Sequence, residues 1–225
     1  MRPDGTGFDC APPRRPPATR LAGLLVAPLA ERIRGWLRAG KLLEEDLERV
    51  LSVDARALVD HPVDPSDRVP VADVEGLVAL ASEQLGGDPA LVEWAEAIVD
   101  EWCRGDHFDA ILRAAPRLVD APGFVVAQAG ERLLGRSDWR YEGGRRGFAV
   151  RLAGLEGASS ALKSWTGALL ARLASEVGEP GLDVRFEGVD AGALVVFGEP
   201  TVPAGSEDDA AELRESRLLR AALVA

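Results

Sequence analysis

Side chains that could catalyse a reaction are few in this sequence and widely spaced. The two histidines are His61, next to Pro62, and His107, two residues after Gly105. A Ser-His-Asp triad has few ways to form with so few histidines. The Gly-x-Ser-x-Gly turn that presents a nucleophilic serine is missing around Ser159, Ser160, Ser164 and Ser175. We therefore expect no catalytic residues and a protein that is not an enzyme.

Metal binding through a histidine would depend on His107 alone. A histidine ligand normally has a second-shell partner that orients its ring, and none can be identified near His107 in the sequence. We interpret it as a capping or surface residue, and expect no metal and no cofactor. The cysteines, Cys10 and Cys103, are too far apart to suggest a metal knuckle or a disulfide framework. Their sparse use is typical of a reducing cytoplasm, where we expect the protein to be.

The glycine-rich stretch 143–147 could suggest a phosphate-binding loop. It lacks the Lys-Ser/Thr pair of such loops and is not followed by the start of a helix, whose amides would bind phosphate. We interpret it as a hairpin turn with Arg145 and Arg146 in solvent.

Charge and hydropathy exclude two classes of partner. The formal net charge is -11, and Lys41 and Lys163 are the only lysines, so a phosphate-neutralising surface is not expected. The longest apolar run, Leu21 to Ala30, contains Pro28 and is too short to span a bilayer. We expect binding to neither nucleic acid nor membrane.

The elements that must position any site are clearest in the second half of the chain. Phe148, Val150 and Leu152 alternate with less apolar residues, and so do those of 182–186, which predicts half-buried strands. The continuously apolar run 193–197 predicts a strand covered on both faces. Trp139 begins a further strand, which is joined to 148–152 by the hairpin.

A long helix is predicted between these strands, from about residue 160 to 177. Leu162, Trp165, Leu169, Leu173 and Val177 recur at helical spacing, with Ser159 or Ser160 as the N-cap and Gly178 beyond the end. A second side of the helix has small residues, which favour close packing on the sheet and would also permit self-association. These are Ser164, Gly167, Ala168 and Ala171.

Helical periodicity dominates the first half of the chain. It predicts helices at 21–36, 42–51, 54–59, 73–85, 88–102, 108–119 and 124–134, with Pro116 interrupting the sixth. The expected fold is α+β, with a helical N-terminal half packed on a small, mainly antiparallel sheet with one long crossing helix. We expect a disordered tail at 1–18, a single globular ligand-binding-like domain at 19–200, and an acidic linker with a C-terminal helix at 201–225.

This order of features resembles a known family at several anchor segments. They are Val69-Pro70-Val71 leading to Leu85-Gly86-Gly87, Ala115 to Leu118, Trp139 to Gly143, Phe148 to Leu155, the helix with Trp165, Thr166 and Gly167, and the two closing strands. The chain resembles an uncharacterised bacterial family, expanded as paralogues in myxobacteria, that is distantly similar to the heme-nitric-oxide-binding and 4-vinyl-reductase type of small-molecule-binding fold. The resemblance covers most of residues 20–199.

The resemblance implies a non-enzymatic regulatory or sensory domain that binds a small apolar ligand. Metal-binding relatives often have cysteines near the last helix and closing hairpin, whereas residues 189–197 contain none, so a cysteine-ligated site is absent. In the heme-binding relatives a helical histidine ligates iron, and His107 is the one candidate for that role here. The candidate pocket residues are Trp139, Tyr141, Trp165, Leu169 and Phe186. The alternative is a scaffold or protein-interaction module with a closed core, since tryptophans on apolar helix faces are usually core residues.

Overall fold

The structure is a computed structural model that describes residues 20–104, 108, 112–113, 121–134, 139–144, 147–155, 157–178, 182–189 and 193–200. For residues 139–144, Val189 and Pro200 it describes the backbone alone. Several predictions therefore lie outside the described residues. They concern the tail at 1–18, His107, most of the helix at 108–119, the hairpin tip at 145–146, and the linker and helix at 201–225.

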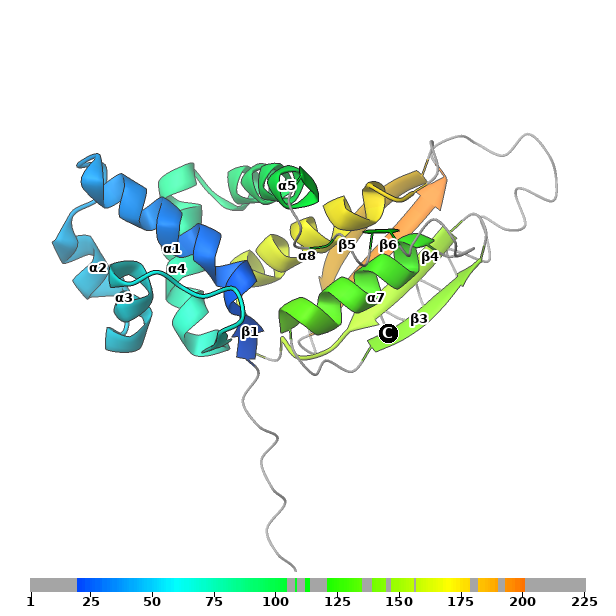
Figure 1. The fold of residues 1–225 in the computed structure, drawn as a ribbon, viewed down its shortest axis with the longest axis horizontal. Helices are drawn as coiled ribbons and strands as arrows, with labels where there is room; N and C mark the ends of the chain where they lie inside the picture. Colours follow the sequence, from blue (N-terminus) through cyan, green and yellow to red (C-terminus); the bar gives the residue numbers. More distant parts are fainter. Residues whose placement is uncertain are drawn as a thin grey trace, which may run out of the picture.

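The fold is α+β, as the sequence predicts, with helices in the first half of the chain and a sheet in the second (Figure 1). The first half contains β1 (Arg20–Ala22), α1 (Gly23–Arg38), α2 (Glu44–Val50), α3 (Val53–Asp60), β2 (Arg68–Pro70), α4 (Val71–Leu85), α5 (Asp88–Arg104) and α7 (Ala121–Leu134). The second half contains β3 (Trp139–Gly144), β4 (Gly147–Leu152), α8 (Ser160–Ser175), β5 (Leu182–Val189) and β6 (Ala193–Pro200). Each predicted helix within the described ranges is present, with its ends shifted by up to three residues.

The short strand β1 corrects the prediction that the first helix begins at Leu21. Leu21 lies opposite Val69 in an antiparallel pair with β2. The helix begins two residues later, where the Gly23 N–H donates to the Asp67 carbonyl at 2.8 Å. A Cβ at position 23 would lie 1.9 Å from the Asp64 carbonyl oxygen, so only glycine fits this close approach.

Two glycines end α4, as the sequence predicts. Gly86 and Gly87 both have positive φ, at 100° and 115°, and both donate their N–H to the Ser82 carbonyl. The Ser82 hydroxyl donates to Asp88 Oδ1 at 2.7 Å, which ties the end of α4 to the start of α5. From this junction the chain enters α5, which packs on α8.

The sheet has four strands in the order β3-β4-β6-β5, and every neighbouring pair is antiparallel. Val150 of β4 lies opposite Val196 of β6, which lies opposite Phe186 of β5. These three side chains share the face that packs on α7 and α8. The prediction of a small antiparallel sheet with one long crossing helix is confirmed, and β5 and β6 extend three residues beyond their predicted ends.

Helix α8 lies at the centre of the molecule, in contact with both the helical half and the sheet. It contacts α4, α5 and α7 as well as β5 and β6, so its small-residue side is buried along with its large apolar side. The helix ends at Ser175, and Gly178 does not adopt a positive φ. One continuous apolar core connects the helical half to this helix and the sheet.

Candidate functional site

The side chain at the centre of the candidate site is Trp165. It is fully buried on α8 and packs on Trp94 of α5, with ring centroids 4.8 Å apart and planes at 37°. Leu169, one helical turn further along, is also fully buried. The structure thus brings two predicted pocket residues together and adds Trp94 beside them.

A guanidinium group extends this aromatic contact to the protein surface. The Arg32 Cζ lies 5.5 Å from the Trp36 ring centroid and 5.6 Å from that of Trp94. Such cation–ring contacts each contribute about 0.5–1 kcal/mol when partly exposed. Arg32 and Trp36 belong to α1, so an Arg–aromatic row connects α1 through α5 to the buried Trp165.

Two buried polar atoms on α8 have no hydrogen-bond partner within the described part of the chain. They are the Trp165 Nε1 and the Thr166 Oγ1, and both side chains are fully buried. Proteins satisfy about nine in ten buried polar groups, so each exception calls for a physical explanation. An indole N–H can only donate, whereas a hydroxyl both donates and accepts. A ligand atom or an ordered water would satisfy either group.

Phe186 lies on a different side of α8. A Cβ at Gly167 would come within 2.3 Å of the Phe186 ring, so this ring fills the notch left by the glycine. Positions 165 and 167 point in directions about 200° apart around a helix. Phe186 therefore packs β5 on α8 and does not line the same space as Trp165.

The remaining predicted pocket residues, Trp139 and Tyr141, belong to β3. The strand order puts β3 and β5 at opposite edges of the sheet, about 14 Å apart at normal strand spacing. Their side chains lie outside the described residues. Of the five predicted residues, Trp165 and Leu169 lie together on α8 and Phe186 packs on another side of that helix, while the place of Trp139 and Tyr141 in a pocket stays a prediction.

The small-residue side of α8, predicted for packing or self-association, is mostly inside the chain. Gly167, Ala168 and Ala171 are buried, and Ser164 is the member that is partly exposed. This is the intramolecular packing that the sequence favours. Self-association through this side stays a prediction.

A pair of ionic contacts lies further along the boundary between α5 and α8. Arg172 Nη2 is 2.8 Å from Asp100 Oδ1 and 2.6 Å from Glu176 Oε1. The free thiol of Cys103 lies on the same stretch of α5, and its pKa is raised, first by burial and then by Glu176. A raised pKa keeps the thiol protonated near neutral pH, so Cys103 is a poor nucleophile.

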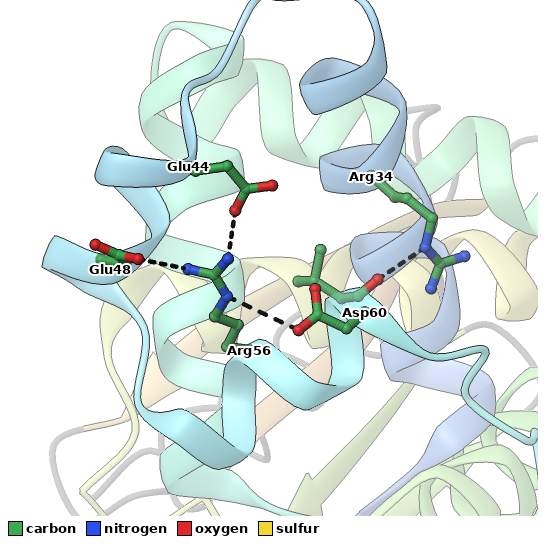
Figure 2. A network of polar contacts seen from close by, with 6 residues as sticks. Arg34, Glu44, Glu48, Arg56 and Asp60 are labelled. Carbon is green, nitrogen blue, oxygen red and sulfur yellow. Dashed lines mark hydrogen bonds and ion pairs between the residues drawn. The ribbon is translucent and has the colours of Figure 1, made fainter.

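A second polar group, on α2 and α3, is structural. The Arg56 guanidinium contacts Glu44, Glu48 and Asp60 (Figure 2). Its acidic partners are largely exposed, and surface ion pairs of this kind contribute about 0–1 kcal/mol each. The network therefore fastens two short helices together.

The other histidine, His61, takes part through its backbone. Arg34, labelled in Figure 2, donates from Nε to the Val59 carbonyl at 2.8 Å. Its Nη2 donates to the His61 carbonyl at 2.9 Å, so Arg34 anchors the end of α3 to α1. The His61 residue itself is exposed. Nothing in this arrangement uses the imidazole.

Sequence reasoning missed three residues of the central arrangement: Trp94, Arg32 and Glu75. Trp94 belongs to the helix predicted at 88–102, but periodicity does not show which residue it packs on. Arg32 had no signal beyond its position four residues before Trp36. Glu75 on α4 accepts from the Ser159 N–H at 2.8 Å, a long-range contact with no local sequence pattern.

Metal sites and membrane spans were also sought in the structure. Among the residues that it describes, no three His, Cys, Asp or Glu side chains are grouped so that they could hold a metal ion. No helix in the described ranges is both long and apolar enough to cross a membrane.

No family model and no curated protein matches this chain. The family resemblance drawn from the anchor segments stays a prediction. Function has to be argued from the side chains around α8.

Proposed function

We propose that the protein is a non-enzymatic regulatory or sensory domain that binds a small, mainly apolar ligand beside α8. The observation that carries this proposal is the pair of buried polar atoms, Trp165 Nε1 and Thr166 Oγ1, which lack a partner among the described residues. Leaving such a group unsatisfied costs about 1–3 kcal/mol. A ligand that accepts a hydrogen bond there would recover this free energy.

The surroundings of Trp165 define the chemistry of that ligand. The neighbouring side chains, such as Leu169 and Trp94, are apolar, so a charged ligand would lose its hydration without a counter-charge. The ligand should therefore be neutral, with an apolar body and an oxygen that can accept hydrogen bonds from the indole N–H and from the Thr166 hydroxyl. A ketone or an aldehyde has this character.

The position of α8 supports a regulatory role. The helix contacts α4, α5, α7, β5 and β6, so a ligand that shifts it would affect both halves of the fold. A ligand can shift a conformational equilibrium only by its difference in affinity for the two states. We place the protein in the cytoplasm, because the thiol of Cys103 is free and the cysteines are sparse.

Native mass spectrometry tests the proposal directly. Freshly purified protein should retain a small molecule, or the apo protein should be stabilised by neutral aromatic ketones or aliphatic aldehydes and show quenched tryptophan fluorescence. Thr166→Val should weaken binding about fivefold, which corresponds to one hydrogen bond of about 1 kcal/mol. Ser164→Ala is the matched control, because it removes a hydroxyl from another side of the same helix. A clean apo mass together with no response to any probe would refute the proposal.

The second candidate is a scaffold or protein-interaction module with a closed core. Its supporting observation is that Trp165 and Leu169 are fully buried and that Phe186 fills the notch at Gly167. In that case Thr166→Val simply removes an unsatisfied hydroxyl. It should then raise stability without changing the response to any ligand.

If the protein is a scaffold, self-association is the first interaction to test. Ser164 is the partly exposed member of the small-residue side, so a homodimer there requires some opening of α8 from its neighbours. Ala168→Leu together with Ala171→Leu would disturb the monomer core as well. Sedimentation of Ser164→Arg is the cleaner test, since an unchanged mass distribution would count against a dimer at this position.

A further inference from the structure

A small apolar cluster lies on the face of the sheet opposite α7 and α8. It consists of Ala149 on β4 with Val195 and Phe197 on β6. Side chains alternate between the faces of a strand, and the intervening Val150 and Val196 point to the helices. Phe197 of β6 is paired with Ala149 of β4 and with Arg185 of β5. These three side chains therefore lie on the face of the sheet away from α7 and α8, which we call the second face.

These side chains are covered, although α7 and α8 pack on the other face. Val195 is 0% exposed, and Ala149 and Phe197 are each 3% exposed. A strand at a bare sheet surface would leave a phenylalanine ring open to water. The described helices that contact the sheet, α7 and α8, pack on the other face, so they do not account for this burial.

The shape of the apolar area suits one helix. Toward the β5 edge the outward residues are charged, namely Asp183, Arg185 and Glu187. Arg151 and Glu199 share this face on β4 and β6, so the apolar area consists of Ala149, Val195 and Phe197. Two neighbouring strands are about 5 Å apart, and a helix with its side chains is about 10 Å wide. One helix along the strands would cover the cluster.

We infer that residues 210–224 of this chain pack on the second face and bury Val195 and Phe197. Nine of these fifteen residues are Ala, Leu or Val, and a helix of that length would be about 22 Å long, against about 20 Å for a six-residue strand. The chain leaves the sheet at Pro200, the end of β6, which is the strand of Val195 and Phe197. Residues 201–209 can span up to about 30 Å, which is enough for the chain to turn back over the sheet.

No other long stretch outside the described residues fits this position. Residues 1–19 join β1 beside the helical half and consist largely of Pro, Gly and charged residues. Residues 105–120 connect α5 to α7, and Phe108 within them packs on Trp102, in the core of the helix-covered face. The remaining gaps are four residues long or shorter.

Photo-crosslinking of the full chain tests this inference. Benzoylphenylalanine replacing Phe197 should form a crosslink that peptide mass spectrometry assigns to residues 210–224. The matched control has the same amino acid at Leu43, which is 61% exposed on the helical half and should give no such crosslink. Leu218→Asp combined with Leu219→Asp should abolish the crosslink at position 197 and increase the fluorescence of an added apolar dye several-fold.

Each other outcome overturns the inference. A crosslink to residues 1–19, a crosslink between two copies of the chain, or no crosslink at all would assign the face to another occupant or leave it open. An unchanged crosslink in the Leu218 and Leu219 variant would show that these side chains do not make the contact. Far-ultraviolet circular dichroism establishes that each variant is folded before its crosslinks are compared.

Discussion

Ser159 donates its backbone N–H to Glu75 Oε1 at 2.8 Å, across 84 residues of sequence. The Ser159 hydroxyl in turn accepts from the Leu162 N–H at 3.2 Å. In a capping box both contacts come from one helix, with an acid at the third helical position. Here that position is Leu162, and the acid comes from α4. The start of the central helix is therefore completed by the helical half of the fold.

Glu75→Ala should lower the free energy of unfolding by about 1 kcal/mol, because the Ser159 N–H loses its acceptor. Glu75→Gln should lose less, since the amide oxygen can still accept. Urea denaturation followed by circular dichroism measures both changes. Glu83→Ala is the control, because Glu83 is an exposed residue of the same helix. An equal loss in the control and in Glu75→Ala would contradict a capping role.

Gly167→Ala should destabilise the protein by about 1–3 kcal/mol, although alanine normally favours a helix over glycine by about 1 kcal/mol. The new Cβ would lie 2.3–2.9 Å from Phe186 ring atoms. Gly35→Ala in α1 is the matched control, since its Cβ would meet nothing within 4 Å, and this change should stabilise by about 0.5–1 kcal/mol. Phe186→Leu should recover part of the loss in a double-mutant cycle. Stabilisation by both alanines would mean that Phe186 moves aside freely.

The sequence predicts elements in this protein better than contacts between them. Alternation in β4 and β5 identifies their buried faces, because a half-buried strand has a period of two whatever packs on it. The continuously apolar β6 is likewise found at the centre of the sheet. The three-residue strand β1 has no such signal, and Leu21 continues the helical pattern of α1. Its strand conformation depends on pairing with Val69, which only the folded chain provides.

The candidate site shows the same limit. Trp165 is predictable as a buried residue of a helix, but its contact with Trp94 joins two helices whose relative position depends on the whole fold. Phe186 and Trp165 are both predicted pocket residues, and the sequence does not show on which side of the helix each one lies. The structure separates them, because neighbouring positions on α8 face different partners, β5 for Gly167 and α5 for Trp165.

Thr166→Val should raise the stability of ligand-free protein by about 1 kcal/mol, because it removes a buried hydroxyl that has no partner among the described residues while keeping the side-chain shape. Thermal unfolding of the apo protein measures this. Thr166→Ser keeps the hydroxyl and loses a methyl group, so it should destabilise. A destabilised valine variant would show that the hydroxyl already has a partner, and would remove the main support for a ligand at that atom.

Cys103 should titrate above its ordinary range, because burial and then Glu176 raise its pKa. The stability associated with the protonated thiol is fully present below the pKa of the unfolded state and is lost as pH rises through the higher folded-state pKa. In a Cys10→Ser background, the rate of iodoacetamide alkylation against pH should have a higher midpoint in the folded protein than in urea. Glu176→Gln should move the folded midpoint down. Equal midpoints in the folded and unfolded protein would contradict the raised pKa.

Trp94→Ala should destabilise the protein by about 3 kcal/mol and shift the emission of Trp165 to longer wavelength. The half-buried Trp94 ring covers Trp165 at 4.8 Å, so its removal opens a cavity and admits water to the indole. Trp94→Phe should keep most of the ring contact and lose much less. The fluorescence emission of each variant distinguishes the two cases, because neither alanine nor phenylalanine at position 94 adds appreciable emission. If Trp165 emission is the same in both variants, Trp94 does not shield it, and the ligand proposed beside α8 would have to approach from another side of the helix.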